Sequence, residues 1–384
     1  MYINFWYAME ESKNLTAEEP IKIRRLNQDF ALWRDSEGKA HCVHDVCVHR
    51  GGSLGKGKIY DNCVQCPYHG WRFNGQGDCE YIPSLGKDNQ KIPQRAKVDA
   101  YPTQEIDGVI FAFLGDLPEE ERPPLMHAGR NFEGMEYDPK KWRFTAMGWD
   151  VESNYERCVE NGIDPSHNEF VHPSHGHGAQ NLDEYSVPSY DVKHHEWGQG
   201  FWVDFNARAP REGSVVSQSG SEGGKLKVGT GHNGPNSVYT YIHITSENWA
   251  HQYLYETPVN SKLTRAINVS MVNFVDDDTP DEDINAMNEY IASQDVVVLN
   301  EIEPKVTPSS AKLEVMTPSD KCVVEYRRWL KKWDQKGWRI DHKKVEAELG
   351  EVVYAIPSPR RRTEKGWVFP TVPLIPGTED EAAE

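Results

Sequence analysis

Two patterns of apolar and polar positions divide the chain. From about Ile21 to Phe113, short apolar runs are separated by turn-forming clusters such as 35–38 (DSEG) and 74–77 (NGQG), which predicts a small all-β domain. The run 109–114 (VIFAFL) is typical of a buried strand. Further along, the chain alternates like half-buried antiparallel strands and then has a helix-length segment over 281–299. The alternating runs are 200–205, 238–244, 252–255 and 266–271.

These patterns predict an α+β protein of two domains. A charged, Pro-rich segment at 116–125 has the composition of a linker, which places the first domain at 1–120 and the second at 126–384. A chain of 384 residues is long enough to bury two cores. The end of the chain, 377–384, is expected to be an acidic disordered tail.

Composition narrows the class of protein. A net charge of -18 argues against nucleic-acid binding, which needs clustered Lys and Arg. Seven cysteines form no even framework, which indicates a reducing compartment. No basic segment followed by an apolar core opens the chain, and no run is as long as a membrane span. A cytoplasmic protein is therefore expected.

Two short loops combine a cysteine with a histidine. Cys47 and His49 lie in CVHRGG, and Cys66 and His69 lie in CPYHGW. If the cysteines hold one iron and the histidines hold another, the four residues bind a Rieske-type [2Fe–2S] cluster, which transfers one electron at a time. A structural zinc site is the alternative, but zinc knuckles usually pair two cysteines in one half and two histidines in the other. The mixed halves favour the cluster.

A second set of metal-binding residues follows. His167 and His172 lie five residues apart, and on a helix they would not share a face unless a π-bulge or kink, which Pro165 and Pro173 permit, brought them together. Two imidazoles and one carboxylate leave three positions of an Fe(II) ion open, as oxygen activation requires. The alternative is that these histidines belong to a polar, His-rich loop, and His175 and His177 are interpreted as pocket or surface residues.

Together these residues resemble the terminal oxygenase (alpha) subunit of the Rieske non-haem iron oxygenases. The resemblance covers the chain to about residue 174 and is greatest to the branch that contains vanillate and dicamba demethylases and ketosteroid hydroxylase. It implies a helix-grip catalytic domain in which His167 and His172 are iron ligands. It also implies that Asp164 accepts hydrogen bonds from His167 and from His69 of the partner subunit, in a homotrimer. Asn161 matches a family position close to the iron.

The third iron ligand must be a carboxylate from far along the chain. Asp276, Asp277, Asp278 and the acidic residues 281–283 are most simply a solvated turn before a helix. Asp295 lies later in that helix, as a single charge before Val296–Leu299, and it resembles the late-helix aspartate of the family. A buried carboxylate in apolar surroundings needs a metal or a partner, so Asp295 is the predicted ligand.

The resemblance implies an enzyme that uses O₂ and electrons from NAD(P)H, delivered by a separate reductase or ferredoxin, to hydroxylate or oxidatively demethylate a small ring compound. Cis-dihydroxylation of an aromatic ring uses the same residues and stays open. The alternative from another class is a Rieske electron-transfer protein with a degenerate second domain. Phe201, Tyr241 and Met271 are candidates for the pocket wall, and 211–234 is either a lid or a flexible loop. The basic triplet 360–362 is either a docking site or a solvated turn.

Overall fold

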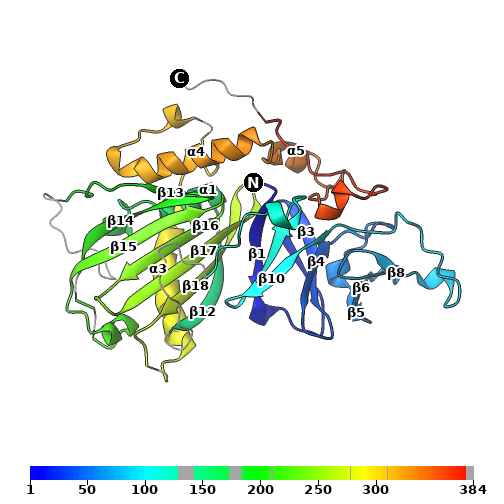
Figure 1. Cartoon of the computed structure of the whole chain (residues 1–384), viewed down its shortest axis with the longest axis horizontal. Helices are drawn as coiled ribbons and strands as arrows, with labels where there is room; N and C mark the ends of the chain where they lie inside the picture. The colour runs from blue at the N-terminus through cyan, green and yellow to red at the C-terminus, as the bar shows by residue number, and fades with distance from the viewer. Residues whose placement is uncertain are drawn as a thin grey trace. The chain divides into compact units, whose positions relative to one another are not determined.

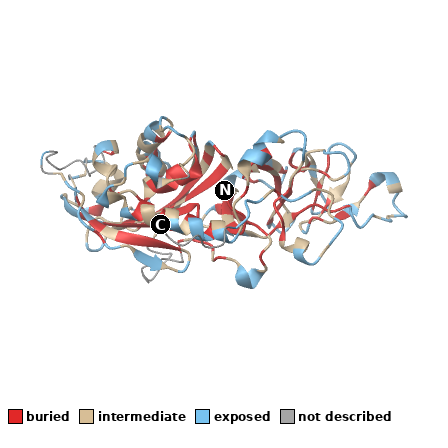
Figure 2. Cartoon of the chain, turned by 90° about the horizontal axis from the view of Figure 1, so that it is seen from above, coloured by how far each residue is buried: buried red, intermediate tan, exposed pale blue. Residues whose placement is uncertain are grey.

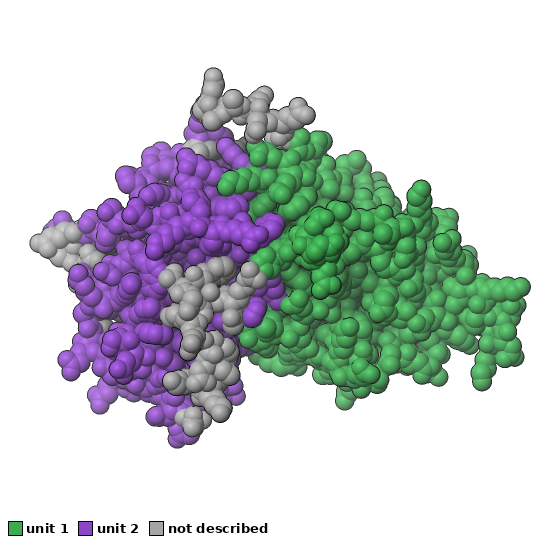
Figure 3. Space-filling model, viewed as in Figure 1, with its two compact units in different colours: residues 1–124, 257–261, 332–384 green, residues 125–256, 262–331 purple. Residues whose placement is uncertain are grey.

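The structure is a computed structural model, and it describes residues 1–128, 142–172, 183, 185–207, 209–210, 212–276, 278–308 and 310–377. Pro173, His175, His177, Arg211, Asp277 and the predicted acidic tail at 378–384 lie outside the described residues. Two compact units form (Figure 3): unit 1 is Met1–Pro124, Thr257–Ser261 and Lys332–Glu384, and unit 2 is Leu125–Glu256 and Lys262–Lys331.

Unit 1 contains three small antiparallel sheets, which confirms the predicted all-β first domain (Figure 1). The first sheet has the order β1-β11-β10, with β1 at Phe5–Glu11, β10 at Thr103–Ile106 and β11 at Val109–Leu114. The second has the order β2-β3-β4-β9: Ile21–Arg25, Gln28–Arg34, Ala40–His44 and Ala100–Tyr101. The third has the order β5-β6-β7-β8: Lys58–Tyr60, Cys63–Gln65, Arg72–Phe73 and Cys79–Tyr81. All six residues of β11 are buried, as its apolar sequence predicts.

The end of the chain belongs to unit 1, whereas the pattern of the sequence suggested a second domain running from 126 to the C-terminus. Helix α4, Lys321–Gln335, ends in unit 1, and α5, His342–Ala347, follows it. The chain returns because Trp333 packs edge-on against Phe5 and Tyr2, with ring centroids 5.0 and 5.9 Å away. The predicted linker is also held by unit 1, since Asn4 Oδ1 accepts hydrogen bonds from the backbone N–H groups of 116 and 117.

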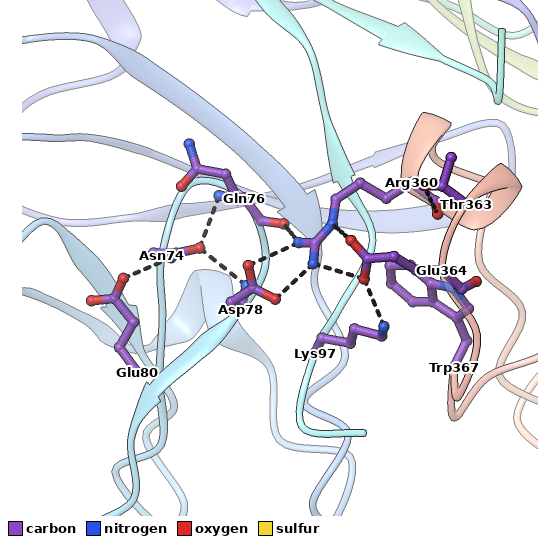
Figure 4. A network of polar contacts seen from close by, with 9 residues as sticks. All are labelled: Asn74, Gln76, Asp78, Glu80, Lys97, Arg360, Thr363, Glu364 and Trp367. Atoms are coloured by element: carbon purple, nitrogen blue, oxygen red, sulfur yellow. Dashed lines mark hydrogen bonds and ion pairs between the residues drawn. The ribbon is translucent and has the colours of Figure 1, made fainter. Parts of the chain in front are cut away.

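The basic triplet 360–362 forms ion pairs within unit 1. Arg360 contacts both Asp78 and Glu364 at 2.8 Å, and Lys97 contacts Glu364 at 2.7 Å (Figure 4). The loop that presents Asp78 is held by Asn74, whose Oδ1 accepts hydrogen bonds from the backbone N–H groups of 76 and 78. The triplet is therefore neither a simple solvated turn nor a free basic patch.

Unit 2 is built on a seven-stranded antiparallel sheet with the order β12-β18-β17-β16-β15-β14-β13. The strands are β12 Arg143–Val151, β13 Lys193–His195, β14 Gly198–Ala207, β15 Gly224–Asn233, β16 Ser237–His243, β17 Trp249–Asn260 and β18 Leu263–Val272. The four alternating runs of the sequence lie in β14, β16, β17 and β18, as predicted. The segment 211–234 is not a single loop, because its second half forms β15.

Three helices of unit 2 carry the candidate site. Helix α1, Tyr155–Gly162, begins after Asn154, whose side chain accepts a hydrogen bond from the backbone N–H of Glu156. Helix α2 is the short segment Asn168–Val171. Helix α3 is Asp281–Leu299, the predicted bounds, and its acidic first turn suits the positive end of the helix dipole. Buried residues concentrate along the strands of the sheet (Figure 2).

Candidate cluster and metal sites

The two Cys-His loops of unit 1 adopt the same backbone turn. The N–H of Gly51 donates to the carbonyl of Cys47, and the N–H of Gly70 donates to the carbonyl of Cys66, at 2.9 and 3.0 Å. In each loop the cysteine N–H donates to the carbonyl five residues later, at 2.8 Å in both. The φ angles of +73° and +72° at the two glycines are readily available only to that residue. The turns therefore favour glycine at these two positions of the sequence pattern.

The four side chains are arranged by depth. Cys47 and Cys66 are 1% and 2% exposed, whereas His49 and His69 are exposed to solvent and their ring centroids are 4.3 Å apart. The indole of Trp71 stacks on His49 at 4.6 Å. A hydrogen bond from Cys47, together with backbone N–H groups of 68 and 69, lowers the pKa of Cys66, whereas the same hydrogen bond and burial raise the pKa of Cys47, so the thiolate is favoured at Cys66.

The residues fit a cluster held between the loops. A β-carbon at Gly52 would lie 2.7 Å from the Sγ of Cys66, so the glycine keeps open the space beside that sulfur. Buried sulfurs and surface imidazoles suit an iron pair in which one iron takes thiolates and the other takes histidines. The structure brings together all four residues that the sequence predicted for this site.

The second site lies in unit 2, where three predicted residues converge. Ligand atoms of His167, His172 and Asp295 all lie within 4.8 Å of one another. The Nε2 atoms of His167 and His172 are 3.7 and 3.2 Å from Oδ1 of Asp295. The sequence predicts a π-bulge or a kink, and the structure has a break in the helix: His167 precedes α2, and His172 follows it with φ -116° and ψ 53°, which turns its ring back toward α3.

Hydrogen bonds fix which nitrogen of each imidazole faces the site. Nδ1 of His167 lies 2.7 Å from the backbone carbonyl of Asp164, and Nδ1 of His172 lies 2.8 Å from the amide oxygen of Gln294. A carbonyl oxygen accepts only, so each Nδ1 carries the proton and each Nε2 keeps its lone pair for a metal. Two neutral imidazoles and a carboxylate on one side fit a mononuclear iron site with open positions.

Asn161 and Asp164 support this site. Asn161 donates from Nδ2 to Oδ1 of Asp295 at 3.0 Å and so orients the carboxylate. Burial would raise the pKa of Asp295, but His172, His167 and Asn161 outweigh it and hold that pKa below its usual value. The carboxylate of Asp164 accepts from the backbone N–H groups of Ser166 and His167, at 2.9 and 3.0 Å. Its Oδ2 is 3.6 Å from the ring of His167, so that ring donates to the Asp164 carbonyl instead.

Sequence reasoning missed Gln294. This residue directly precedes Asp295 on α3, and its role depends on the position of His172, which is distant in sequence. The only signal for it in the sequence is a polar residue beside a predicted metal ligand in a helix.

The metal-binding residues open into a cavity of about 910 Å³ inside unit 2. Its walls are the inner face of the sheet and α3. Phe201 lines the cavity, as predicted, but Tyr241 and Met271 do not. Successive side chains of a strand point to opposite faces, and Thr240 and Ser270 occupy the inward positions beside them. The segment 211–234 also lines the cavity, before β15 through residues such as Ser214–Val216 and Gln218, and within β15 through Leu226, Val228 and Thr230.

Comparisons with known proteins match both units. Residues 5–102 match the Rieske [2Fe-2S] domain, and residues 151–336 match the vanillate O-demethylase oxygenase C-terminal domain. Chlorophyllide a oxygenase, chloroplastic, of Chlamydomonas reinhardtii is 27% identical over 346 residues, which are 85% of this chain and 47% of the relative. Methylxanthine N1-demethylase NdmA of Pseudomonas putida is 26% identical over 320 residues, 81% of this chain and 82% of the relative. The chain spans less than half of the length of several curated relatives that it matches.

Solved structures share the fold. NdmA of Pseudomonas putida CBB5 with caffeine has a TM-score of 0.69 at 23% identity, over 90% of this chain and 93% of that one. Dicamba monooxygenase bound to 3,6 dichlorosalicylic acid has a TM-score of 0.71 at 21% identity, over 87% of this chain and 97% of that one. At these identities the likeness concerns the arrangement of the chain alone.

Proposed function

This chain belongs to the Rieske non-haem iron oxygenases, as an alpha subunit with a vanillate demethylase-type C-terminal domain, and from this we propose that it is the terminal oxygenase of a monooxygenase or demethylase system. The substrate would be a small ring compound that is hydroxylated or loses a methyl group by oxidation. The observation that carries the proposal is the geometry of His167, His172 and Asp295, whose ligand atoms all lie within 4.8 Å of one another beside a large cavity.

Cys47, His49, Cys66 and His69 would hold the [2Fe–2S] cluster, and His167, His172 and Asp295 would hold the iron. Bound there, the cluster supplies single electrons and the iron activates O₂. Electrons would come from NAD(P)H through a separate reductase or ferredoxin.

The chain's own residues prepare this chemistry. Asn161 holds the Asp295 carboxylate, while Gln294 and the Asp164 carbonyl hold the two imidazoles in the metal-binding tautomer. Residues such as Phe201, Val228 and Leu254 give the cavity an apolar wall, which excludes water from the reacting centre.

The carboxylate of Asp164 is proposed to link the two sites across subunits of a homotrimer, through His69 of the partner subunit. Unit 1 carries all four proposed cluster ligands and unit 2 carries all three proposed iron ligands. The link therefore requires only that unit 1 of one chain lies beside unit 2 of a neighbouring copy. Subunit mixing tests this: Cys66→Ala and His167→Ala chains are separately inactive, and co-assembled they should regain activity. If mixed assemblies stay inactive while both parents assemble normally, the link across subunits is rejected. Within the described part of the chain, no helix has the length and apolar character needed to cross a membrane.

The activity is tested by a single turnover. The reduced protein is mixed with O₂ and a panel of ring compounds, and products are weighed by mass spectrometry. Gain of one oxygen, or loss of a methyl group as formaldehyde, supports the proposal, whereas gain of two oxygens and two hydrogens indicates a ring dihydroxylase. Iron analysis separates the electron-carrier alternative, since a carrier holds two irons per chain and the oxygenase three. His167→Ala should keep the visible spectrum of the cluster and abolish oxygenation.

A further inference from the structure

Four polar side chains on the cavity wall have an atom that no described protein group satisfies: that of the half-buried Ser214, and those of three buried residues. Oε2 of Glu256, Oδ1 of Asn268 and Nδ2 of Asn288 are buried and have no hydrogen-bond partner among the described residues. The three residues are 5%, 3% and 2% exposed, and all line the cavity that contains the iron-binding residues. Buried polar groups are nearly always paired, so three unpaired atoms around one cavity indicate a missing partner.

These residues come from both walls of the cavity. Glu256 is on β17, Asn268 is on the adjacent strand β18, and Asn288 is on α3. Asn288 is already oriented, because its Oδ1 accepts a hydrogen bond from Nε2 of Gln252 at 3.3 Å and its Nδ2 remains available. A few polar groups placed in an otherwise apolar cavity are the usual means of orienting a ligand.

Their positions relative to the iron-binding residues follow from the elements. Asn288 precedes Asp295 by seven residues on α3, which places it about two turns or ~10 Å along the helix. Glu256 and Gln252 face the cavity from β17 and are four residues apart, about 13 Å along the strand. Gln252 contacts Asn288, so these two residues lie side by side about two helical turns from Asp295. The polar groups of the wall therefore extend along α3 from near Asp295 toward Asn288.

We propose that Glu256, Asn268 and Asn288 form a subsite that binds an uncharged hydroxyl, carbonyl or amide group of an otherwise apolar substrate. The subsite would determine which carbon of the substrate faces His167, His172 and Asp295. This inference rests on the proposed oxygenase function, and it adds the class of substrate and the residues that select it.

The charges around the cavity favour a neutral ligand. Among the described residues that line it, none is Lys or Arg, whereas Asp164, Glu256, Asp283 and Asp295 are acidic. A carboxylate ligand would therefore find no positively charged side chain on this wall. Burial, with a smaller contribution from the negative charge of Asp295, raises the pKa of Glu256 to about 8. The raised pKa favours the un-ionised carboxyl, which offers an O–H donor to a hydroxyl or carbonyl oxygen.

The test measures equilibrium binding by calorimetry with four compounds of one skeleton: tetralin, 1-tetralone, 1-aminotetralin and tetralin-1-carboxylate. The proposal expects the ketone to bind about tenfold more tightly than the hydrocarbon, and the carboxylate to bind most weakly. Asn288→Leu and Glu256→Leu, which each remove a donor that a ketone oxygen can accept from, should each reduce the preference for the ketone several-fold. Glu256→Gln keeps a donor and should retain it within about threefold.

Thr240→Val is the matched control. Thr240 lines the same cavity, but its hydroxyl already contacts that of Thr230 at 3.4 Å, so its loss should leave the preference unchanged. Cluster absorbance and iron content show whether each variant is folded and loaded. Three results would overturn the subsite. The amine could bind most tightly and lose that affinity in Glu256→Gln, or the carboxylate could bind most tightly. The third is that the ketone binds no more tightly than the hydrocarbon.

Binding is measured without turnover, so the two proposals fail separately. Absence of product in the single-turnover reaction rejects the oxygenase function and leaves the binding pattern to be judged by itself. A missing ketone preference in a protein that does oxygenate rejects only the subsite.

Discussion

Replacing Arg361 tests whether the end of the chain is a structural part of unit 1. Arg361 makes a two-pronged contact with Asp99, with both nitrogen–oxygen distances at 2.7 Å, and the two side chains are 13% and 3% exposed. Asp99 also accepts hydrogen bonds from the backbone N–H and hydroxyl of Ser358. Arg361→Ala therefore leaves a buried carboxylate without its counter-charge, and removing one partner of a buried pair costs about 3–5 kcal/mol.

Adjacent Arg362 supplies a matched control. It pairs with Asp116 at 3.2 Å, but these side chains are 45% and 29% exposed, and such pairs contribute about 1 kcal/mol or less. Unfolding in urea, followed by the visible absorbance of the cluster, reports on unit 1. With a slope of about 3 kcal/mol per molar urea, Arg361→Ala should lower the midpoint by about 1 M or more, and Arg362→Ala by about 0.3 M or less.

A third variant separates charge from contact. Adding Asp99→Asn to Arg361→Ala removes the buried charge, so the double variant should be more stable than Arg361→Ala alone. Equal midpoints for the Arg361 and Arg362 variants, or a loss below 1 kcal/mol for Arg361→Ala, would refute the reasoning.

Two further changes test the metal sites. Gly52→Ala places a β-carbon 2.7 Å from Sγ of Cys66 and should reduce cluster absorbance per chain, whereas Gly51→Ala meets nothing within 4 Å and costs about 1–2 kcal/mol of backbone strain, so its cluster should persist. Equal absorbance in the two variants contradicts the steric argument. Gln294→Leu removes the acceptor of His172 and should weaken Fe(II) binding about 10- to 100-fold in a chelator competition, while Gln294→Glu keeps an acceptor and should bind more tightly than the Leu variant.

The sequence predicts best where one local signal is sufficient. The bounds of α3 follow from Pro280 and an acidic first turn. The two Cys-His loops are readable because cysteine, histidine and glycine recur at short spacing. Asp295 is a candidate because it resembles the late-helix aspartate of the family and because one carboxylate precedes four apolar residues, and the structure places it beside His167 and His172.

Properties that depend on distant parts of the chain are not readable in this way. Alternation shows that β16 has two faces, but Tyr239 and Tyr241 are buried on the face away from the cavity, so apolar character alone does not tell which face is inward. The sequence indicates that a π-bulge or a kink is needed to bring His167 and His172 together, but it does not show that the helix between them is the four-residue α2, which ends before His172. The path of residues 332–377 depends on Trp333 and Arg361 finding partners near the start of the chain.

Unit 1 combines Met1–Pro124 with residues made much later, and this affects how the protein is synthesised. A ribosome that has just completed Pro124 must still add the whole of unit 2 before Arg361 appears, which takes roughly 10 to 50 s at about 5–20 residues per second. During that time Asp99 is without its guanidinium partner. The N-terminal segment therefore waits for unit 2 to be translated, and a chain that stops within unit 2 leaves both units unfinished.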